Sequence, residues 1–332
     1  MTHGENHMLN EYKAHVDERA NQNIPPLPLD ADQTSQLVDL LKADHEESEL
    51  LLHLLKERVP AGVDQAAYVK AAFLSDITTG KADSPHVSKV DAVQILGTML
   101  GGYNIQPLIE CLKIDGLGSD AANALSKTLL IFDAFNEIFE LANTNEHAKR
   151  VIDSWAEGTW FTEKSEIPNQ IKLTVYKVPG EINTDDLSPA TDAWSRPDIP
   201  LHALAMFKMP REGIERPLET IDELKEKGNP LVFVGDVVGT GSSRKSATNS
   251  VLWHMGDEIP CIPNKKEGGF CFGGKIAPIF FNTLEDSGAF PIELDVSNME
   301  MGQEIILEPH NGRVLDANTN EVITTFELKT NV

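Results

Sequence analysis

The chain has 332 residues, a length that predicts two domains, each able to bury a core of its own. Its formal net charge of −24 repels phosphate backbones at long range, which disfavours the binding of mRNA or other nucleic acids. No apolar run approaches the roughly 20 residues that cross a bilayer, and the start, MTHGENHMLNEY, contains no apolar signal core. We therefore expect a cytoplasmic protein that makes no use of a membrane.

Cysteine usage limits the redox and metal chemistry open to the chain. Cys111, Cys261 and Cys271 are an odd and sparse set that does not form a disulfide framework, so a reducing compartment is expected. No two of them have the Cys-x-x-Cys spacing. We therefore expect no metal site and no [4Fe–4S] cluster bound by this chain alone.

The first half of the chain has the pattern of consecutive helices, after residues 1–7, which we interpret as an appended extension. Apolar residues recur at helical spacing in segments at about 64–78, 88–100, 104–113, 119–131, 133–142 and 145–156. Short links with glycine or proline separate the segments, and consecutive helices joined by short links pack antiparallel. Residues 8–160 are therefore predicted to form a stack of helical hairpins of the HEAT-like kind.

The pattern changes at Pro168, after a polar linker near 158–170. Residues 173–178 alternate like a half-buried strand, and residues 231–234 form a short apolar run typical of a fully buried strand. The second half also holds helix-like stretches and a terminal meander, at about 219–227, 243–254, 281–287 and 304–328. Residues 168–332 are therefore predicted to form a mixed α and β domain.

The segment 232–249, VFVGDVVGTGSSRKSATN, carries the clearest chemical signal. A buried strand is expected to run into a glycine-rich turn, then Ser242-Ser243-Arg244, then a helix. A helix start offers unpaired N–H groups and a positive dipole end, and an arginine adds a guanidinium fork, so the segment fits a carboxylate. The alternative is that a serine only caps the helix while Arg244 pairs on the surface, and spacing alone leaves both interpretations open.

A second segment, 183–196 with the sequence NTDDLSPATDAWSR, is dense in turn-forming residues. Taken alone, it predicts a polar loop with Asx turns. Its end, Trp194-Ser195-Arg196, would bring Arg196 to the same cleft as Ser242. No histidine is tied to Ser242 by spacing, so a Ser-His-Asp arrangement is not predicted.

A third segment, 268–275 with the sequence GGFCFGGK, matches the first part of the phosphate-binding P-loop spacing. Ile276 stands where serine or threonine should contact magnesium, and a strand-like IAPIFF follows where a helix should begin. The nucleotide interpretation is therefore rejected, and a tight structural turn is expected.

At these segments the chain resembles the aconitases. GTGSSRKSATNS and TDDLSPATDAWSRPDIPLHALAM are similar to the swivelling domain of that family, above all of its bacterial B type, in which this domain follows a HEAT-like helical domain. YVKAAFL, LGGYNIQPLIE and IAPIFFNTLEDSGAFPIE also resemble family segments, so the resemblance covers residues 8–332. It implies a HEAT-like stack followed by an aconitase-type swivelling β/β/α domain.

The resemblance also implies an activity and the residues that carry it. The family are lyases of the tricarboxylic acid cycle that interconvert citrate and isocitrate through cis-aconitate, and B-type members also hydrate 2-methyl-cis-aconitate. Ser242 resembles the serine whose alkoxide takes the carbon-bound proton, and Ser243 resembles a substrate contact. Arg196 and Arg244 resemble the arginines that hold substrate carboxylates, and Asp185 resembles an aspartate that positions the site. An alkoxide needs such nearby positive charge and N–H donors.

The family holds its [4Fe–4S] cluster through three cysteines in further domains that follow the swivelling domain. No cysteine of this chain fits that role, so we expect the chain to be the N-terminal part of a longer enzyme. It would depend on the cluster domains of the same parent chain and be inactive alone. Lys245 departs from the acidic residue that many other aconitases have after the arginine, a difference between subtypes.

Two other interpretations stay open. The chain could be a freestanding swivelling subunit that meets its cluster subunit in trans, as in isopropylmalate isomerase, although the long helical half argues against this. It could also be an interaction module, because the helical domain of B-type aconitases is implicated in iron-responsive homodimerisation and in mRNA binding. The net charge of −24 makes RNA binding the weakest part of that interpretation.

Overall fold

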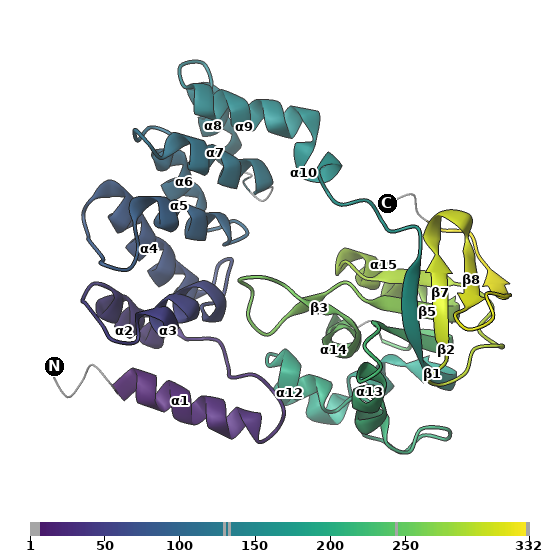
Figure 1. Ribbon diagram of the computed structural model, residues 1–332. Helices are drawn as coiled ribbons and strands as arrows, with labels where there is room; N and C mark the ends of the chain where they lie inside the picture. The colour runs from purple at the N-terminus through teal and green to yellow at the C-terminus, as the bar shows by residue number, and fades with distance from the viewer. Residues whose placement is uncertain (1–6, 129–130, 132–133, 243–244, 330–332) are drawn as a thin grey trace. The chain divides into compact units, whose positions relative to one another are not determined.

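The computed structural model describes residues 7–329 except 129–130, 132–133 and 243–244. The chain divides into two compact units, Met1–Ser165 with Pro260–Pro263 and Glu166–Ile259 with Asn264–Val332. A helical first half followed by a mixed α and β second half confirms the predicted fold class (Figure 1). No helix in the described part of the chain is long and apolar enough to cross a membrane.

The first unit is built from helices packed in chain order. They are α1 (His7–Ala20), α2 (Ala31–Leu41), α3 (Ser48–His53), the π-helical turn η1 (Leu54–Arg58), α4 (Gln65–Thr79), α5 (Lys89–Gly97), α6 (Ile105–Cys111), α7 (Gly118–Lys127), α8 (Phe135–Leu141), α9 (Glu146–Glu157) and α10 (Thr159–Thr162). Helices α2, α4, α5, α7 and α9 form a row in which each packs against the next, and α6 and α8 pack beside α7 and α9 (Figure 1). The predicted succession of helices is confirmed, and the HEAT-like assignment stays a prediction.

Local sequence accounts for where several of these helices begin and end. Asp30 caps α2 and Ser88 caps α5, each through a reciprocal capping box with the residue three positions on. Gly80 ends α4 in the left-handed conformation, with φ of 75°, which glycine adopts without a Cβ penalty. The boundary between the two units follows Ser165, within the expected linker near 158–170, whose first part contains the short helix α10.

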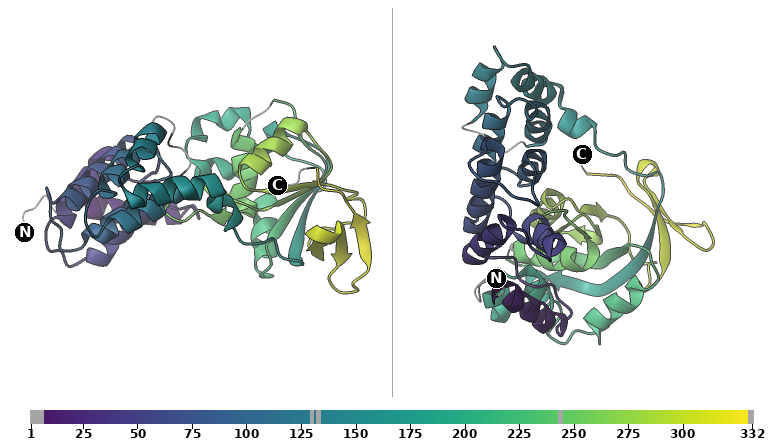
Figure 2. Two further views of the ribbon diagram at one scale, coloured as in Figure 1. Left: turned by 90° about the horizontal axis from the view of Figure 1, so that it is seen from above. Right: turned by 60° about the vertical axis from the view of Figure 1, so that its left-hand side comes forward.

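The second unit contains a seven-stranded sheet in the order β6-β5-β2-β1-β7-β8-β9. The last strands of the chain are drawn in yellow in Figure 2. The strands of the sheet are β1 (Ile171–Asn183), β2 (Leu231–Thr240), β5 (Phe270–Ile276), β6 (Phe290–Glu293), β7 (Glu304–Glu308), β8 (Arg313–Asp316) and β9 (Val322–Thr325). The first four of these run parallel, and β7, β8 and β9 form the predicted antiparallel meander. A separate two-stranded hairpin pairs β3 (Asp257–Glu258) with β4 (Lys266–Glu267).

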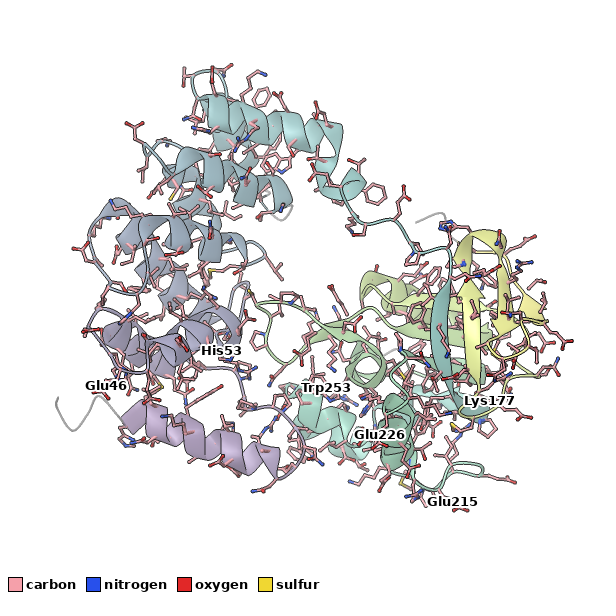
Figure 3. All side chains as sticks on the ribbon, in the orientation of Figure 1. Glu46, His53, Lys177, Glu215, Glu226 and Trp253 are labelled. Carbon is pink, nitrogen blue, oxygen red and sulfur yellow. The ribbon has the colours of Figure 1, made fainter. Side chains whose placement is uncertain are left out.

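Helices cover one face of this sheet. On the other face, side chains of β7, of β8 and of the loop before β7 pack against side chains of β1, β2 and β5. The helices of the unit are α11 (Thr184–Leu187), the 3₁₀ helix η3 (Ala190–Ser195), α12 (Ile199–Ala203), α13 (Pro217–Lys225), α14 (Lys245–Met255), α15 (Pro278–Asp286) and the 3₁₀ turn η4 (Pro309–Asn311). Strand residues alternate between two cores, so Phe233 packs with the helices while Val232 and Val234 pack on the other face. Trp253 of α14 is labelled in Figure 3, and Lys266 Nζ lies over its ring, 4.9 Å from the ring centroid.

Two local predictions were wrong. The segment 268–275 is mostly the buried strand β5 rather than a tight turn, because its glycines serve close packing, and a Cβ on Gly274 would lie 2.6 Å from Asp236 O. The strand-like IAPIFF instead opens helix α15, with Pro278 in its first turn. Strand β2 runs on to Thr240, and the expected glycine-rich turn before Ser242 follows it, with Gly241 at φ of 87°.

Candidate active site

The two segments singled out by the sequence meet at one edge of the sheet. Strands β1 and β2 are parallel neighbours, and Asn183 at the end of β1 is paired with Thr240 at the end of β2. In open α/β sheets, ligands bind outside the carboxyl ends of the strands. The residues after Asn183 and after Thr240 are therefore placed where such a sheet builds a site.

The segment after β1 is a short capped helix rather than the expected polar loop. Asn183 Oδ1 accepts the N–H of Asp185 at 2.9 Å, and the carboxylate of Asp186 accepts the N–H of Asn183 at 2.8 Å. Asp186 also forms an ion pair with Arg211 at 3.0 Å. These bonds fix the backbone of α11 and leave the side chain of Asp185 exposed.

Ser242 is held against α11 by its backbone. The hydroxyl of Thr184 donates to Ser242 O at 2.6 Å. Gly241 has φ of 87°, and a Cβ there would lie 2.6–2.9 Å from the side chain of Asn183, so glycine is required for the two chain ends to approach. The side chain of Ser242 itself is exposed. Ser243 and Arg244 lie outside the described residues.

Arg196 follows η3 and is half-buried. Its Nε is buried and has no hydrogen-bond partner among the described residues. An unsatisfied buried donor costs about 1–3 kcal/mol, and more for a charged group. A carboxylate that accepts from this guanidinium would remove that cost, so Arg196 has the chemistry of an anion-binding residue.

The sequence reasoning missed a histidine in this region, His202 of α12. Its Nε2 lies 2.7 Å from Ser188 Oγ and its Nδ1 lies 2.8 Å from Ser195 Oγ, and the ring is buried. Ser188 Oγ is also 2.7 Å from Ser246 Oγ, in the first turn of α14. The only sequence signal was a single histidine between apolar residues in LHALAM, a pattern typical of a core histidine.

The pKa of His202 is lowered from its ordinary value, first by burial and then by the positive charge of Arg196. The backbone and the carboxylate of Asp192 act in the opposite direction. The ring is therefore neutral at neutral pH, with one donor and one acceptor nitrogen. The electrostatic effect also puts the guanidinium of Arg196 in the neighbourhood of this ring.

The cysteines do not fit an iron–sulfur cluster. Such clusters need thiolates, but Cys111 and Cys271 are buried in helix α6 and strand β5, and burial raises the pKa of the Cys111 thiol and raises that of Cys271 to about 12. Burial also raises the pKa of Cys261. Across the described residues, no group of three or more His, Cys, Asp or Glu side chains could hold a metal ion.

Comparison with known proteins gives consistent matches over both units. Aconitate hydratase B of Pseudomonas aeruginosa is 58% identical over 334 residues, covering 98% of this chain and 38% of that protein. Aconitate hydratase B of Escherichia coli is also 58% identical over 334 residues, covering 98% of this chain and 39% of that protein. The chain thus spans less than two fifths of the length of these relatives.

Among solved structures, 3-isopropylmalate dehydratase (leuD) from Methanocaldococcus jannaschii matches with a TM-score of 0.35 and 18% identity, covering 48% of this chain and 83% of that one. Two family models match consecutive parts of the chain. Aconitate B N-terminal domain matches residues 11–161, and Aconitate hydratase 2 N-terminus matches residues 173–332. The chain belongs to the aconitate hydratase B family, whose N-terminal portion it matches over nearly its whole length.

Proposed function

We propose that this chain is the N-terminal, carboxylate-binding part of a lyase of the tricarboxylic acid cycle. The enzyme interconverts citrate and isocitrate through cis-aconitate, and it also hydrates 2-methyl-cis-aconitate. One observation carries the proposal: the bond from Thr184 to Ser242 joins the ends of β1 and β2, so that Ser242 stands beside the helical turn of Asp185. The family match supports the reaction.

Each residue has a stated role in this proposal. Ser242, as an alkoxide, takes the proton from the substrate carbon. The guanidinium of Arg196 pairs with a substrate carboxylate through a donor that has no partner among the described residues. Asp185 positions the site from α11. Ser243 as a substrate contact and Arg244 as a second carboxylate partner follow from the motif alone.

A [4Fe–4S] cluster, in this proposal, is held by further domains of the same parent chain, because the buried thiols of Cys111 and Cys271 do not fit it. The relatives carry the matched part within a longer protein, which supports this arrangement over a separate cluster subunit. The 332-residue chain is accordingly expected to bind tricarboxylates without turning them over.

The test measures citrate affinity of the chain by isothermal titration calorimetry. Arg196→Gln should weaken binding about 10- to 100-fold, the effect of losing one charge-assisted hydrogen bond. Ser242→Ala should leave affinity within about threefold but abolish turnover in the complete, cluster-loaded enzyme, because it removes only the base.

A matched control removes a positive charge elsewhere in the same unit. Arg216 is 63% exposed in its side chain and pairs with Glu223 at 3.1 Å, so Arg216→Gln should leave citrate affinity unchanged. Equal losses in the Arg196 and Arg216 variants would reduce the effect to net charge. Full turnover by the Ser242→Ala enzyme would overturn the assignment of the base.

Exposed aromatic side chains on the helical unit favour a second function, which is contact between two copies of the chain. Phe135 and Phe139 of α8 are 42% and 54% exposed, their rings stack at 6.0 Å, and Trp155 stacks on Phe135 at 6.1 Å. Contiguous exposed aromatics mark interaction surfaces. Sedimentation velocity with and without ferrous iron tests a homodimer, and Phe139→Ser should lower its stability. A monomer under every condition would dismiss it.

A further inference from the structure

His202 occupies the centre of a hydrogen-bonded chain that joins three elements. Its ring lies in α12, while its bonded partners are Ser188, after α11, and Ser195, the last residue of η3. Ser188 in turn contacts Ser246 of α14. The ring is only 2% exposed, so these contacts replace solvent as its hydrogen-bond partners.

The number of protons fixes the direction of each bond. The hydroxyl of Ser195 donates to Asp192 O at 2.8 Å, so Ser195 Oγ accepts and His202 Nδ1 carries the hydrogen. Nε2 of the neutral ring is then an acceptor, and Ser188 donates to it at 2.7 Å. Ser188 Oγ in turn accepts from the hydroxyl of Ser246. The ring thus takes part in two series of hydrogen bonds. It donates through Nδ1 to Ser195, the Nδ1 arm, and it accepts through Nε2 from Ser188, which accepts from Ser246, the Nε2 arm.

Each arm ends at a part of the site. On the Nδ1 side, Ser195 directly precedes Arg196. On the Nε2 side, Ser246 is the second residue of α14, the helix that follows Ser242-Ser243-Arg244 in the chain. The backbone next to His202 is held as well, because Ala203 O accepts a hydrogen bond from His254 Nε2, near the other end of α14, at 3.1 Å.

The surrounding charges keep this arrangement in one state. The positive charge of Arg196 acts on the ring, and the carboxylate of Asp192 is occupied by Lys208 at 2.9 Å and by Thr191. A protonated ring would place a second positive charge beside Arg196 and would turn Nε2 into a donor facing Ser188. The neutral ring avoids both effects.

We propose that His202 is a positioning residue of the site, which sets Arg196 through Nδ1 and Ser195, and the start of α14 through Nε2, Ser188 and Ser246. This inference rests on the proposed function, because it assigns the two arms to carboxylate binding and to the proton-abstracting loop. The Nδ1 arm governs KM and the Nε2 arm governs kcat.

Two substitutions at one position separate the arms. Asparagine places an amide near the position of Nδ1, so His202→Asn keeps the donor to Ser195 and loses the acceptor for Ser188. Glutamine reaches the position of Nε2, so His202→Gln keeps an acceptor for Ser188 and loses the donor to Ser195. In the complete, cluster-loaded enzyme, His202→Asn should lower kcat about tenfold with KM within about threefold, and His202→Gln should raise KM about tenfold with kcat within about threefold.

Single hydroxyl deletions give a milder form of the same test. Ser195→Ala should raise KM and Ser246→Ala should lower kcat, each about fivefold or more. Ser250→Ala is the matched control, because the Ser250 hydroxyl lies on the same helix and donates to Ser246 O at 3.1 Å without entering the chain around His202. It should leave both constants unchanged.

The outcomes separate this inference from the proposed function. If Ser242→Ala and Arg196→Gln impair the enzyme as expected but the asparagine and glutamine variants change kcat and KM alike, His202 is only structural and the inference fails. If Ser242→Ala and Arg196→Gln leave turnover and citrate affinity intact, the proposed function fails instead. Should both His202 variants fail to fold, the absence of a split between Ser195→Ala and Ser246→Ala overturns the inference.

Discussion

Replacing His254 by glutamine should remove much of the acid sensitivity of the second unit between pH 7 and pH 5. His254 lies near the end of α14, and its Nε2 bonds to Ala203 O at 3.1 Å. Burial, followed by the charges of Lys225 and Lys266, lowers its pKa to about 4, although the bond to Ala203 acts in the opposite direction. Glutamine keeps a donor for Ala203 and has no titrating group.

The magnitude follows from the two pKa values. The pKa of a histidine in the unfolded chain is about 6.5. Below that pH the unfolded chain therefore binds a proton that the folded chain excludes. The folded-state pKa is depressed, so stability is fully present above about 6.5 and is lost as the pH falls towards 4. The free energy of unfolding should fall by about 2 kcal/mol between pH 7 and pH 5 from this group alone.

Urea unfolding of the 332-residue chain at pH 7 and pH 5 measures this loss. Because the two units can unfold separately, the fluorescence of Trp253, with the other tryptophans replaced by phenylalanine, restricts the signal to the second unit. His310→Gln, at an exposed histidine of the same unit, is the control for the replacement of a histidine by glutamine. If wild type and His254→Gln lose the same free energy over this interval, the reasoning from burial is refuted.

Two further predictions concern the sheet. Gly239→Ala should cost about 2–5 kcal/mol, because φ is 79° and a Cβ would lie 2.3–2.5 Å from atoms of Phe280, whereas Gly228→Ala, with φ of 80° and nothing within 4 Å, should cost only about 1–2 kcal/mol. Thermal denaturation compares them, and equal losses would contradict the packing argument. Glu308, whose pKa is lowered to about 2 chiefly by its bond to Arg313, contributes stability that is present above about 4.5 and lost as the pH falls towards 2. Glu308→Gln should therefore lower Tm at pH 7 and flatten its fall in acid, as scanning calorimetry at pH 7, 4 and 3 would show; an unchanged slope would count against it.

The sequence predicts the helices of the first unit well, because apolar residues recur at helical spacing and several helices, such as α2, α4, α5 and α9, begin at a capping side chain. It fails where a glycine has a packing role. The glycines in 268–275 predict a turn. Position 274 instead requires glycine because the backbone of Asp236 on the neighbouring strand lies where a Cβ would be. That neighbour becomes visible only once β2 and β5 are paired.

The segments that form the site can be predicted from the sequence. The side-chain hydrogen bonds that connect these segments cannot. The segments of Asp185 and Ser242 do meet, at the ends of paired strands. The partners of His202 could not be predicted, because Ser188 precedes it by 14 positions and Ser246 follows it by far more, with no periodicity to link them. Long-range side-chain bonds depend on how α12 packs on α14, which composition and spacing do not encode.

The position of β1 has a consequence for how the second unit is made. Its parallel partner β2 follows within sixty residues, but its antiparallel partner β7 begins only at Glu304. At roughly 5–20 residues per second, a ribosome needs on the order of ten seconds between the two. During that time β1 presents an open strand edge, and Leu173 and Val175 on the meander face stay uncovered. The final strands therefore act as a late closure, and the growing chain is most prone to mispairing just before they emerge.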